Sequence, residues 1–416
     1  MIKVITYGTY DLLHYGHKRL LERAKALGDY LIVGVTADNF DKNRGKINVQ
    51  QSLMERIEGV KATGLADEII VEEYEGQKID DIRRYDIDIF TVGSDWLGKF
   101  DYLNEYCKVV YLPRTEGVSS TQVRSDKRKL KIRVYEDNGI ARKIIREGKF
   151  VNGIEVLTDD SAEKEDAIYL ISHPQRHYKV IKSAIKSGKH VLCESPIATS
   201  EAQCRELFEL ARNNNVVLMD AIKTAYATAY TRLLLLVKSG AIGKVVSVDA
   251  TCTSLMGTVA PETLADRWNS ITAWGPTALL PVFQICGTTY TEKHVFSQYL
   301  DKEKNFDGFT KIDFVYPEAV ASIKVAKAAK SEGNLVITGT EGYIYVPAPW
   351  WKTDYFEVKY ENQNLNKRFF YQLEGEGIRY ELVAFSKAIE IGKNNSYVNE
   401  DVSKAIARVI EECQRR

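Results

Sequence analysis

The stretch that decides the fold near the start of the chain is GTYDLLHYGH, residues 8–17. An apolar, β-branched run of strand length precedes it over residues 2–7, and apolar residues at helical spacing follow it over residues 18–27. We therefore predict a strand, a short turn and a helix. The stretch places His14 and His17 three positions apart, where this helix should begin.

A helix N-terminus suits phosphate, because it presents free N–H groups and the positive end of the helix dipole. Gly8 and Gly16 would let the backbone approach a ligand closely there. The imidazoles of His14 and His17 would then donate hydrogen bonds to the phosphoryl oxygens of a nucleotide. The alternative is a strand-turn-helix with one capping histidine and one surface histidine.

The stretch resembles the HxGH signature of nucleotidyltransferases, and residues 1–128 resemble the glycerol-3-phosphate cytidylyltransferases throughout. RTEGVSST, residues 114–121, matches the RTxGISTT box of that family, with Ser120 in place of a threonine. This change keeps the hydroxyl donor. GSDWLGKFD, residues 93–101, matches the family's segment for the nucleotide base.

The resemblance implies that a phosphate oxygen of an acceptor attacks the α-phosphorus of CTP and expels pyrophosphate. Such a transfer needs no protein nucleophile, but it needs alignment and compensation of phosphate charge. Donors and positive charge are implied for four residues: His14, His17, Lys46 and Arg114. Arg56 is implied as a contact to the acceptor or to a phosphate. For Lys46 and Arg56 the alternative is a solvated helix face.

The resemblance also implies the residues that surround the nucleotide: Gly8, Thr9, Tyr10, Asp11, Gly16, Asp95, Trp96, Thr115, Ser119, Ser120 and Thr121. Asp11 would face the metal-bound phosphates. Mg²⁺ should accompany CTP, because phosphate oxygens and carboxylates are the ligands that it prefers. Trp96 either lines the base pocket or packs in the core.

Length and composition predict a cytoplasmic protein of two or three domains. The 416 residues carry 57 lysines and arginines against 57 aspartates and glutamates, so charge gives no argument for nucleic acid or an acidic membrane. The six cysteines lack metal-like spacing and are expected to be reduced thiols. We see neither a secretory leader nor an apolar run long enough for membrane insertion.

A polar, basic run at residues 125–131 predicts a short helical connection to a second part of the chain. Beyond it, a strand at residues 167–172, HPQRH at 173–177 and GKHVLCESP at 188–196 resemble the Gfo/Idh/MocA oxidoreductases. Three later segments match the second domain of that family: residues 239–243, 338–342 and 375–381.

The predicted fold class is α/β, in three parts. A nucleotidyltransferase Rossmann-like domain should occupy residues 1–128. A truncated Rossmann-like domain should follow over residues 129–222, and an α+β open-sheet domain over residues 223–416.

The oxidoreductase resemblance is incomplete where the cofactor would bind. The glycine-rich GxGxxG turn is replaced by VYEDNGIA, residues 134–141, which keeps one glycine and places Glu136 and Asp137 beside the expected pyrophosphate. Gly139 lies only 28 positions before Ala167, so about one αβ unit is absent. We therefore expect NAD(P) to bind differently or not at all.

The family's proposed catalytic positions are also altered. Its CEKP lysine is Ser195 here, and serine cannot act as a cationic proton donor. Lys223, with Tyr226 near it, is the candidate replacement, and the alternative is a surface lysine. His177 resembles the family's helix-starting histidine, or it bonds only to backbone.

Three functions remain open. The favoured one is a cytidylyltransferase that acts on glycerol 3-phosphate or a related small polyol phosphate and supplies a CDP-alditol for a cell-wall or capsule polymer. Its C-terminal module would be non-redox, and a homodimer is expected. The second is a bifunctional enzyme that also reduces a keto-sugar phosphate with NAD(P)H. The third is a binding protein without catalysis, which the intact N-terminal motifs disfavour.

Overall fold

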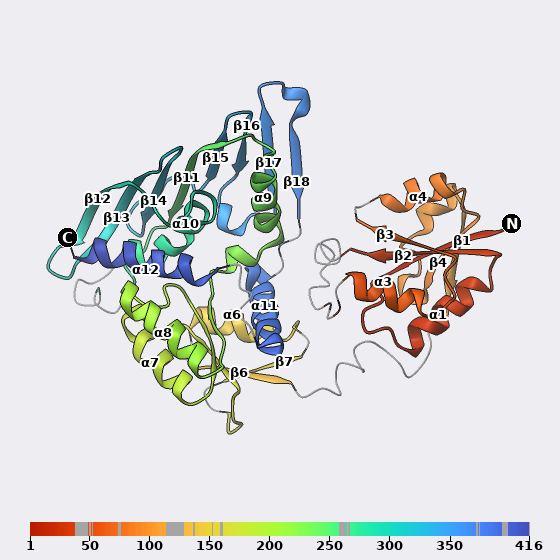
Figure 1. The fold of residues 1–416 in the computed structure, drawn as a ribbon, viewed down its shortest axis with the longest axis horizontal. Coiled ribbons are helices and arrows are strands. Elements are labelled where there is room, and N and C mark those ends of the chain that lie inside the picture. Colours follow the sequence, from red (N-terminus) through yellow and green to blue (C-terminus); the bar gives the residue numbers. More distant parts are fainter. Residues whose placement is uncertain are drawn as a thin grey trace. The chain divides into compact units, whose positions relative to one another are not determined.

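The computed structural model describes the chain except for residues 38–48, 50, 52, 74–75, 114–128, 136–137, 152, 159–160, 258–263, 265–266, 372, 374, 393–397 and 416. The chain divides into two compact units, unit 1 (Met1–Lys129) and unit 2 (Leu130–Arg416). Figure 1 shows unit 1 in red to orange and unit 2 in yellow to blue. Among the described residues, no helix is long and apolar enough to cross a membrane.

Unit 1 is a five-stranded parallel sheet with the order β3-β2-β1-β4-β5. Its strands are β1 (Lys3–Gly8), β2 (Tyr30–Thr36), β3 (Glu68–Glu72), β4 (Ile89–Gly93) and β5 (Lys108–Leu112). Its α-helices are α1 (Tyr15–Lys25), α3 (Leu53–Lys61) and α4 (Gln77–Tyr85). The chain leaves β1 toward β2 on one side and returns to β4 on the other, so the strand order reverses at β1.

Both faces of this sheet are covered by helices, which explains why β1 is apolar at successive positions. Val4 packs on one face with residues of α1 and α3, and Ile5 packs on the other with residues of α4. The predicted strand and helix are confirmed. The helix begins earlier than the periodicity predicts, at Tyr15, because His14 caps it.

Unit 2 begins with a second five-stranded parallel sheet, of order β10-β9-β8-β6-β7. Its strands are β6 (Leu130–Val134), β7 (Ile154–Leu157), β8 (Ala167–Leu170), β9 (His190–Cys193) and β10 (Leu218–Asp220). Its main helices are α6 (Gly139–Gly148), α7 (Pro174–Lys186) and α8 (Glu201–Asn213). A full dinucleotide-binding sheet has the order 3-2-1-4-5-6. Here its third strand is missing beyond β7, as the short spacing to Ala167 predicts.

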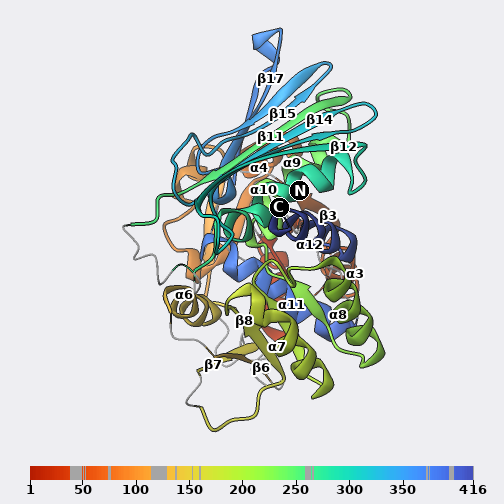
Figure 2. The ribbon, with the colours of Figure 1, turned by 90° about the vertical axis from the view of Figure 1, so that its left-hand side faces the viewer.

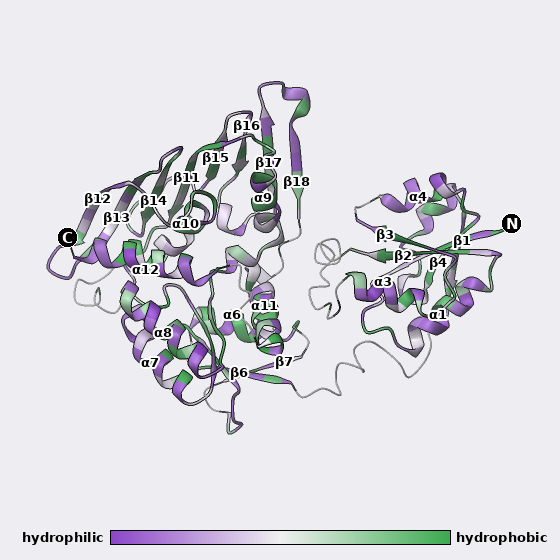
Figure 3. Cartoon of the chain, in the orientation of Figure 1, coloured by the Kyte–Doolittle hydropathy of each residue, from purple (hydrophilic) through white to green (hydrophobic). Residues whose placement is uncertain are grey.

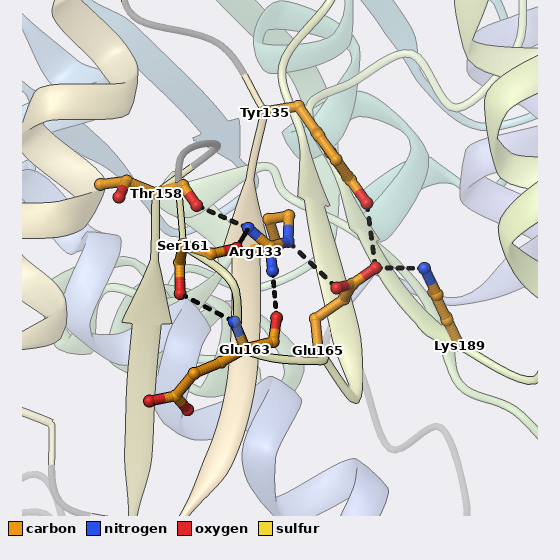
Figure 4. A network of polar contacts seen from close by, with 7 residues as sticks. All are labelled: Arg133, Tyr135, Thr158, Ser161, Glu163, Glu165 and Lys189. Atoms are coloured by element: carbon orange, nitrogen blue, oxygen red, sulfur yellow. Dashed lines mark hydrogen bonds and ion pairs between the residues drawn. The ribbon is translucent and has the colours of Figure 1, made fainter.

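The missing αβ unit leaves a short connection from β7 to β8, which must cross β6 because β6 lies between them. Arg133 of β6 supports this crossing (Figure 4). Its Nη1 donates to the carbonyl oxygens of Thr158 at 2.6 Å and Ser161 at 3.1 Å, and its Nη2 donates to that of Glu163. A helix would satisfy its own carbonyls, and Arg133 does this for an irregular segment.

Glu165, at the end of the crossing, balances the charge of Arg133. Its Oε2 accepts from Arg133 Nε at 3.0 Å, and its Oε1 accepts from the Tyr135 hydroxyl at 2.9 Å and from Lys189. Burial alone would raise the pKa of Glu165, but the hydrogen bonds from Lys189, Arg133 and Tyr135 lower it to about 2. The carboxylate therefore stays ionised and paired near neutral pH.

The rest of unit 2 is an eight-stranded mixed sheet of order β12-β13-β14-β11-β15-β16-β17-β18. Its strands are β11 (Val245–Thr253), β12 (Glu292–Asp301), β13 (Phe306–Val315), β14 (Val320–Ala326), β15 (Leu335–Gly339), β16 (Gly342–Val346), β17 (Tyr355–Tyr360) and β18 (Lys367–Phe370). The other long helices are α9 (Thr228–Lys238), α10 (Ser270–Cys286), α11 (Ile378–Ile391) and α12 (Glu400–Gln414).

Helices join the two sheets of unit 2 into one body. Helix α10 packs on β11, β13 and β14, while α12 packs on both α10 and α8, and α11 packs on α6. Figure 2 shows α10 and α12 between the large sheet and the smaller one. In Figure 3, helices α7 and α8 carry hydrophilic and hydrophobic residues side by side, as expected for helices that bury one face.

The helical connection predicted for residues 125–131 is wrong at its C-terminal end. Residues 125–128 of the predicted helical connection lie outside the described residues, but Leu130 and Lys131 are strand residues of β6. Pairing with β7 on one side and β8 on the other overrides the helical preference of a lysine-rich run. The predicted division at residues 222 and 223 falls inside unit 2, and it stays a prediction.

Replacing Arg133 tests the crossing. Arg133→Met should destabilise unit 2 by about 3–5 kcal/mol, because three backbone carbonyls lose this donor and the buried Glu165 loses one of its two cationic partners. Denaturant unfolding followed by circular dichroism measures the change. The exposed Arg176→Met is the matched control and should cost less than about 0.5 kcal/mol. Equal stability of the two variants would contradict this role for Arg133.

Candidate active site

The HxGH stretch lies at the carboxyl end of β1, where the strand order of unit 1 reverses. Strand β1 pairs in parallel with β2 on one side and β4 on the other. Loops that leave two neighbouring strands in opposite directions open a crevice, and ligands of parallel sheets bind there. Residues 9–14 therefore begin at the position where such a fold takes a ligand.

His14 and His17 lie against each other at the start of α1. Their rings are stacked, with centroids 3.9 Å apart and an angle of 21° between planes. His14 Nδ1 accepts a hydrogen bond from the Gly16 amide at 3.1 Å, which caps the helix. A neutral ring that accepts at Nδ1 carries its hydrogen on Nε2, which makes Nε2 a donor. Two charged rings at this separation would repel, so the stack favours at least one neutral imidazole.

Arg56 shapes the loop that carries this pair. The side chain is fully buried, and its Nη1 donates to the carbonyl oxygens of Thr9 and Thr36, both at 2.8 Å. Its Nε donates to the Gln51 carbonyl at 3.2 Å. Arg56 thus connects the ends of β1 and β2 to residues before α3. The solvated helix face considered for Arg56 is wrong, and a phosphate contact of Arg56 stays a prediction.

Asp11 and Gln51 hold the same loop in an irregular shape. Asp11 Oδ1 accepts from the Gln51 amide at 2.9 Å, and Gln51 Oε1 accepts from the Leu12 amide at 2.7 Å. Tyr10 and Leu12 have φ angles of 54° and 47°, a region that side chains rarely adopt. Such backbone persists where the surroundings enforce it, and it is common at ligand sites.

Tyr10 lies inside unit 1 and supports His17 from behind. Its side chain is buried, and its ring meets that of His17 edge-on at 5.6 Å. A Cβ on Gly8 would lie 3.0 Å from the Tyr10 ring, so the close approach of this ring requires glycine at position 8. Sequence reasoning assigned Gly8 and Tyr10 to nucleotide contact, and the structure gives them a packing role as well.

The segment after β4 leaves the sheet beside the HxGH loop. It forms a short 3₁₀ helix, η1 (Ser94–Trp96), directly after the strand that neighbours β1. Trp96 is 37% exposed, and its ring packs against Phe100 with ring centroids 5.7 Å apart. An exposed indole at this edge suits a stacking surface for a base, so Trp96 and Asp95 remain predicted nucleotide contacts.

Several residues that the sequence predicts to bind phosphate lie outside the described part of the chain. Lys46, Arg114, Thr115, Ser119, Ser120 and Thr121 lie outside the described residues. Within the described residues, no group of three or more His, Cys, Asp or Glu side chains could hold a metal ion.

Unit 2 brings a different set of ionisable side chains to the carboxyl ends of its strands. Tyr169 lies in β8, Glu194 follows β9, and Lys223 begins the 3₁₀ helix η3 (Lys223–Tyr226) after β10. Glu381 joins them from α11, and its Oε1 lies 2.6 Å from the Tyr169 hydroxyl oxygen, within hydrogen-bond distance. Lys223 is partly buried, and the Glu194 and Glu381 carboxylates act on its charge.

The other two candidates of unit 2 bond to backbone. His177 is fully buried, with Nδ1 2.8 Å from the Pro196 carbonyl and Nε2 2.6 Å from the Ser172 carbonyl. It thereby ties the turn after β9 to the end of β8, which is the alternative weighed for it. The Tyr226 hydroxyl donates to the Asp220 carbonyl at 2.9 Å.

Comparison with known proteins fits the geometry of unit 1. A family model described as Cytidylyltransferase-like matches residues 5–126. Over 126 residues the chain is 54% identical to a glycerol-3-phosphate cytidylyltransferase of Bacillus spizizenii, and the match covers 97% of that protein and 30% of this chain. The chain belongs to the cytidylyltransferase family. It is a nucleotidyltransferase, and its motifs lie in the family's order.

This cytidylyltransferase carries an oxidoreductase-like second unit. A family model described as an oxidoreductase family with an NAD-binding Rossmann fold matches residues 106–221. A trans-1,2-dihydrobenzene-1,2-diol dehydrogenase of Xenopus laevis is 26% identical over 268 residues, which are 60% of this chain and 77% of that protein. An oxidoreductase from Agrobacterium radiobacter, solved with NAD⁺, L-tartaric acid and magnesium, matches with a TM-score of 0.58 and 16% identity over 69% of this chain and 97% of that one. Unit 2 therefore has the Gfo/Idh/MocA fold.

The described residues of the cytidylyltransferase's second unit do not fit a dinucleotide held in the usual way. Asn138 caps α6, and its Oδ1 accepts from the Ile140 and Ala141 amides at 2.9 and 3.0 Å. These are the amides that a Rossmann helix offers to pyrophosphate. Glu136 and Asp137 lie outside the described residues.

Sequence reasoning missed Tyr169, Asp220 and Glu381. Tyr169 and Asp220 were the polar positions within otherwise apolar strand runs, which is a usable signal. Glu381 gave no such signal, because α11 is far from β8 in sequence and only the packed structure joins them. Lys223 was named from sequence, and its role as a replacement for the family's lysine stays a prediction.

Stability measurements can distinguish a structural role of Arg56 from a role in substrate binding. Arg56→Met should destabilise unit 1 by about 3 kcal/mol or more, because the buried guanidinium's hydrogen bonds to three backbone carbonyls are lost. Urea unfolding measured by circular dichroism, with the exposed Arg176→Met as control, tests this. If Arg56→Met kept full stability and lost only turnover, Arg56 would be a substrate contact and not a structural support.

Asp220 should give unit 2 a pH-dependent stability. It is 1% exposed, its Oδ2 accepts from the Ser403 hydroxyl at 2.7 Å, and burial raises its pKa to about 7. An unfolded aspartate releases its proton near pH 4. Between these values the native state binds more protons, so stability should fall as pH rises from 4 to 7, by at most about 4 kcal/mol.

Asp220→Asn should remove this part of the pH dependence and leave the fall that is due to Glu194 and Glu381, whose pKa values burial also raises. Denaturant unfolding at pH 5 and pH 8 measures it. The exposed Asp249→Asn should keep the wild-type profile. An unchanged profile for Asp220→Asn would show that Asp220 is ionised in the native state throughout this range.

Proposed function

We propose that unit 1 transfers a cytidylyl group from CTP to the phosphate of glycerol 3-phosphate, or of a related small polyol phosphate. The observation that carries the proposal is the stacked His14–His17 pair, at the start of α1 and at the point where the strand order reverses. The relative in Bacillus spizizenii, 54% identical, is a glycerol-3-phosphate cytidylyltransferase. The closely spaced donors and the relative's name point to the same chemistry.

The transfer requires the protein to align the acceptor with CTP and to compensate the negative charge of the phosphates. A phosphate oxygen of the acceptor forms a bond to the α-phosphorus of CTP, and the bond to the pyrophosphate oxygen breaks. His14 and His17 donate to the triphosphate, where negative charge grows on the leaving pyrophosphate. Lys46 and Arg114 supply fixed positive charge, and Arg114 can grip a phosphate with two parallel hydrogen bonds. CTP enters as its Mg²⁺ complex, because its phosphate oxygens are hard ligands.

The remaining predicted contacts complete the nucleotide site. Asp95 and Trp96 hold the base, and Asp11 faces the Mg²⁺-bound phosphates at the loop that Arg56 supports. The hydroxyls of Thr115, Ser119, Ser120 and Thr121, with Thr9 and the backbone at Gly8 and Gly16, bind phosphate oxygens. The product is a CDP-alditol, the activated form of a polyol phosphate, which suits the synthesis of a cell-wall or capsule polymer.

Unit 2 takes no redox part in this proposal. The Asn138 cap and the missing third strand support this, because both remove places where a dinucleotide binds. Its role would be dimerisation or docking of another enzyme. The bifunctional alternative, which reduces a keto-sugar phosphate first, draws on the NAD⁺ named with the Agrobacterium structure. One assay separates the two.

The assay is pyrophosphate release by the purified full chain with Mg²⁺-CTP and a panel of three- to five-carbon polyol phosphates. Each reaction runs with and without NADPH and the matching keto-phosphate. Release with glycerol 3-phosphate alone supports the proposal. Release that requires both NADPH and a keto-phosphate would overturn the non-redox reading of unit 2.

His14→Ala and His17→Ala should each lower kcat by about 10²-fold or more, because each removes a donor that acts on the growing charge. Circular dichroism should show an unchanged fold. His294→Ala is the matched control, since this histidine is 69% exposed in β12 of unit 2. Turnover close to wild type in both variants would contradict the assignment.

A further inference from the structure

Buried polar atoms without partners gather at one edge of the smaller sheet of unit 2. Ser172 Oγ lies after β8, Ser195 Oγ lies after β9, and Asp220 Oδ1 lies at the end of β10. Glu381 Oε2 in α11 is a fourth such atom, and Ser195 lies close enough to Asp220 to lower the pKa of that carboxyl by a hydrogen bond. Such atoms cost free energy in a folded protein. Their grouping at the carboxyl ends of parallel strands marks a place for a ligand rich in hydrogen-bonding groups.

Tyr169 links two carboxyl groups at this edge. Its hydroxyl oxygen lies 2.6 Å from Glu381 Oε1 and 3.4 Å from Glu194 Oε1. One hydroxyl has one hydrogen, so it can donate to only one carboxylate at a time. A second hydrogen bond to its oxygen requires a protonated carboxyl as donor. Burial raises the pKa of both glutamates, that of Glu381 more strongly, which favours Glu381 as the protonated donor and leaves the Glu194 carboxylate to accept from the hydroxyl.

Lys223 completes the group from η3. The carboxylates of Glu194, Glu381 and Glu376 attract the Lys223 ammonium and raise its pKa. No ion pair within 4 Å joins this ammonium to any described residue. Glu376 is engaged elsewhere, since Lys143 and Lys352 pair with it at 2.9 and 3.0 Å. Lys223 is therefore a charged donor that carboxylates surround but do not contact, and it is partly accessible.

We propose that unit 2 contains a second active site, in which Glu194 is the base and Lys223 is the charge-stabilising group for proton exchange on an uncharged hydroxy-carbonyl compound. The proposal is independent of the cytidylyl transfer, because it uses only residues of unit 2. It also needs no dinucleotide, in keeping with the capped start of α6.

The step balances without an oxidant or reductant. Glu194 takes a proton from the carbon next to the carbonyl group, and that C–H bond breaks. The electron pair moves toward the carbonyl oxygen and forms an enolate, which the Lys223 ammonium stabilises by charge and a hydrogen bond. Glu194 then returns a proton to carbon. Burial raises the pKa of Glu194 above its usual range, which makes it a stronger base.

The chemical class of the ligand follows from the groups at this edge. Ser172, Ser195 and Asp220 offer hydrogen bonds to hydroxyl groups, and Lys223 offers one to a carbonyl oxygen. Carboxyl groups outnumber the single ammonium, because Glu194, Glu381 and Glu376 all act on the charge of Lys223. A phosphate would meet more negative than positive charge here, so an uncharged compound fits better.

Deuterium exchange tests the proposal directly. The full chain is incubated with dihydroxyacetone in D₂O, and ¹H NMR follows the loss of the CH₂ signal against buffer alone. We expect exchange above the buffer rate for the wild type. Glu194→Gln and Lys223→Met should lower the protein-dependent rate by about 10²-fold or more. Lys238→Met, at an exposed lysine in the last turn of α9, should keep the wild-type rate.

Each outcome decides the proposal. Exchange that is absent in the wild type, or that survives in both variants, would overturn it. Consumption of dihydroxyacetone that requires NADH would replace it with a reductase, and faster exchange of dihydroxyacetone phosphate would overturn the ligand class. Circular dichroism checks folding of the variants. If Lys223→Met fails to fold, Glu194→Gln decides, because it keeps the shape of the side chain.

Discussion

The constraint on which both units depend is the reversal of strand order in a parallel sheet. In unit 1 the reversal occurs at β1, between β2 and β4, and in unit 2 it occurs at β6, between β7 and β8. Chain that leaves such strands has to turn away in opposite directions, which opens a crevice at their carboxyl ends. The histidine pair of unit 1 lies at such a crevice. In unit 2 the polar edge lies along β8, β9 and β10, at the same end of the strands.

In each unit a buried arginine donates hydrogen bonds to backbone carbonyls that no helix or strand satisfies. An irregular segment that packs against a sheet brings carbonyl groups that no helix or strand satisfies. Arg56 donates to three of them around the HxGH loop, and Arg133 donates to three of them where the chain crosses β6. Guanidinium suits this task because its donors are rigid and remain charged at any physiological pH. Both arginines stabilise an irregular loop, and one of these loops carries His14, which stacks on His17.

The two units differ in how well their sequence patterns agree with their sites. Every motif of unit 1 lies in one stretch or in the expected order, since phosphate binding uses loops that are contiguous in sequence. The site proposed for unit 2 draws on β8, β9, β10 and α11, and its cation, Lys223, lies outside the position where the family resemblance placed a lysine. A dispersed set of this kind leaves little trace in any single segment. The unpaired atoms of Ser195 and Glu381 become visible only when burial is known.

The sequence by itself determined the strand-turn-helix at residues 8–17, the family of unit 1, the oxidoreductase-like fold of unit 2 and the loss of an αβ unit before Ala167. These follow from periodicity, spacing and motifs, which are local properties of the chain. Only the tertiary structure decided that Arg56 is buried, that His177 bonds to backbone, and that Glu381 meets Tyr169 across 212 positions. Burial and partnership of a polar side chain depend on what packs against it, and segments distant in sequence supply those neighbours.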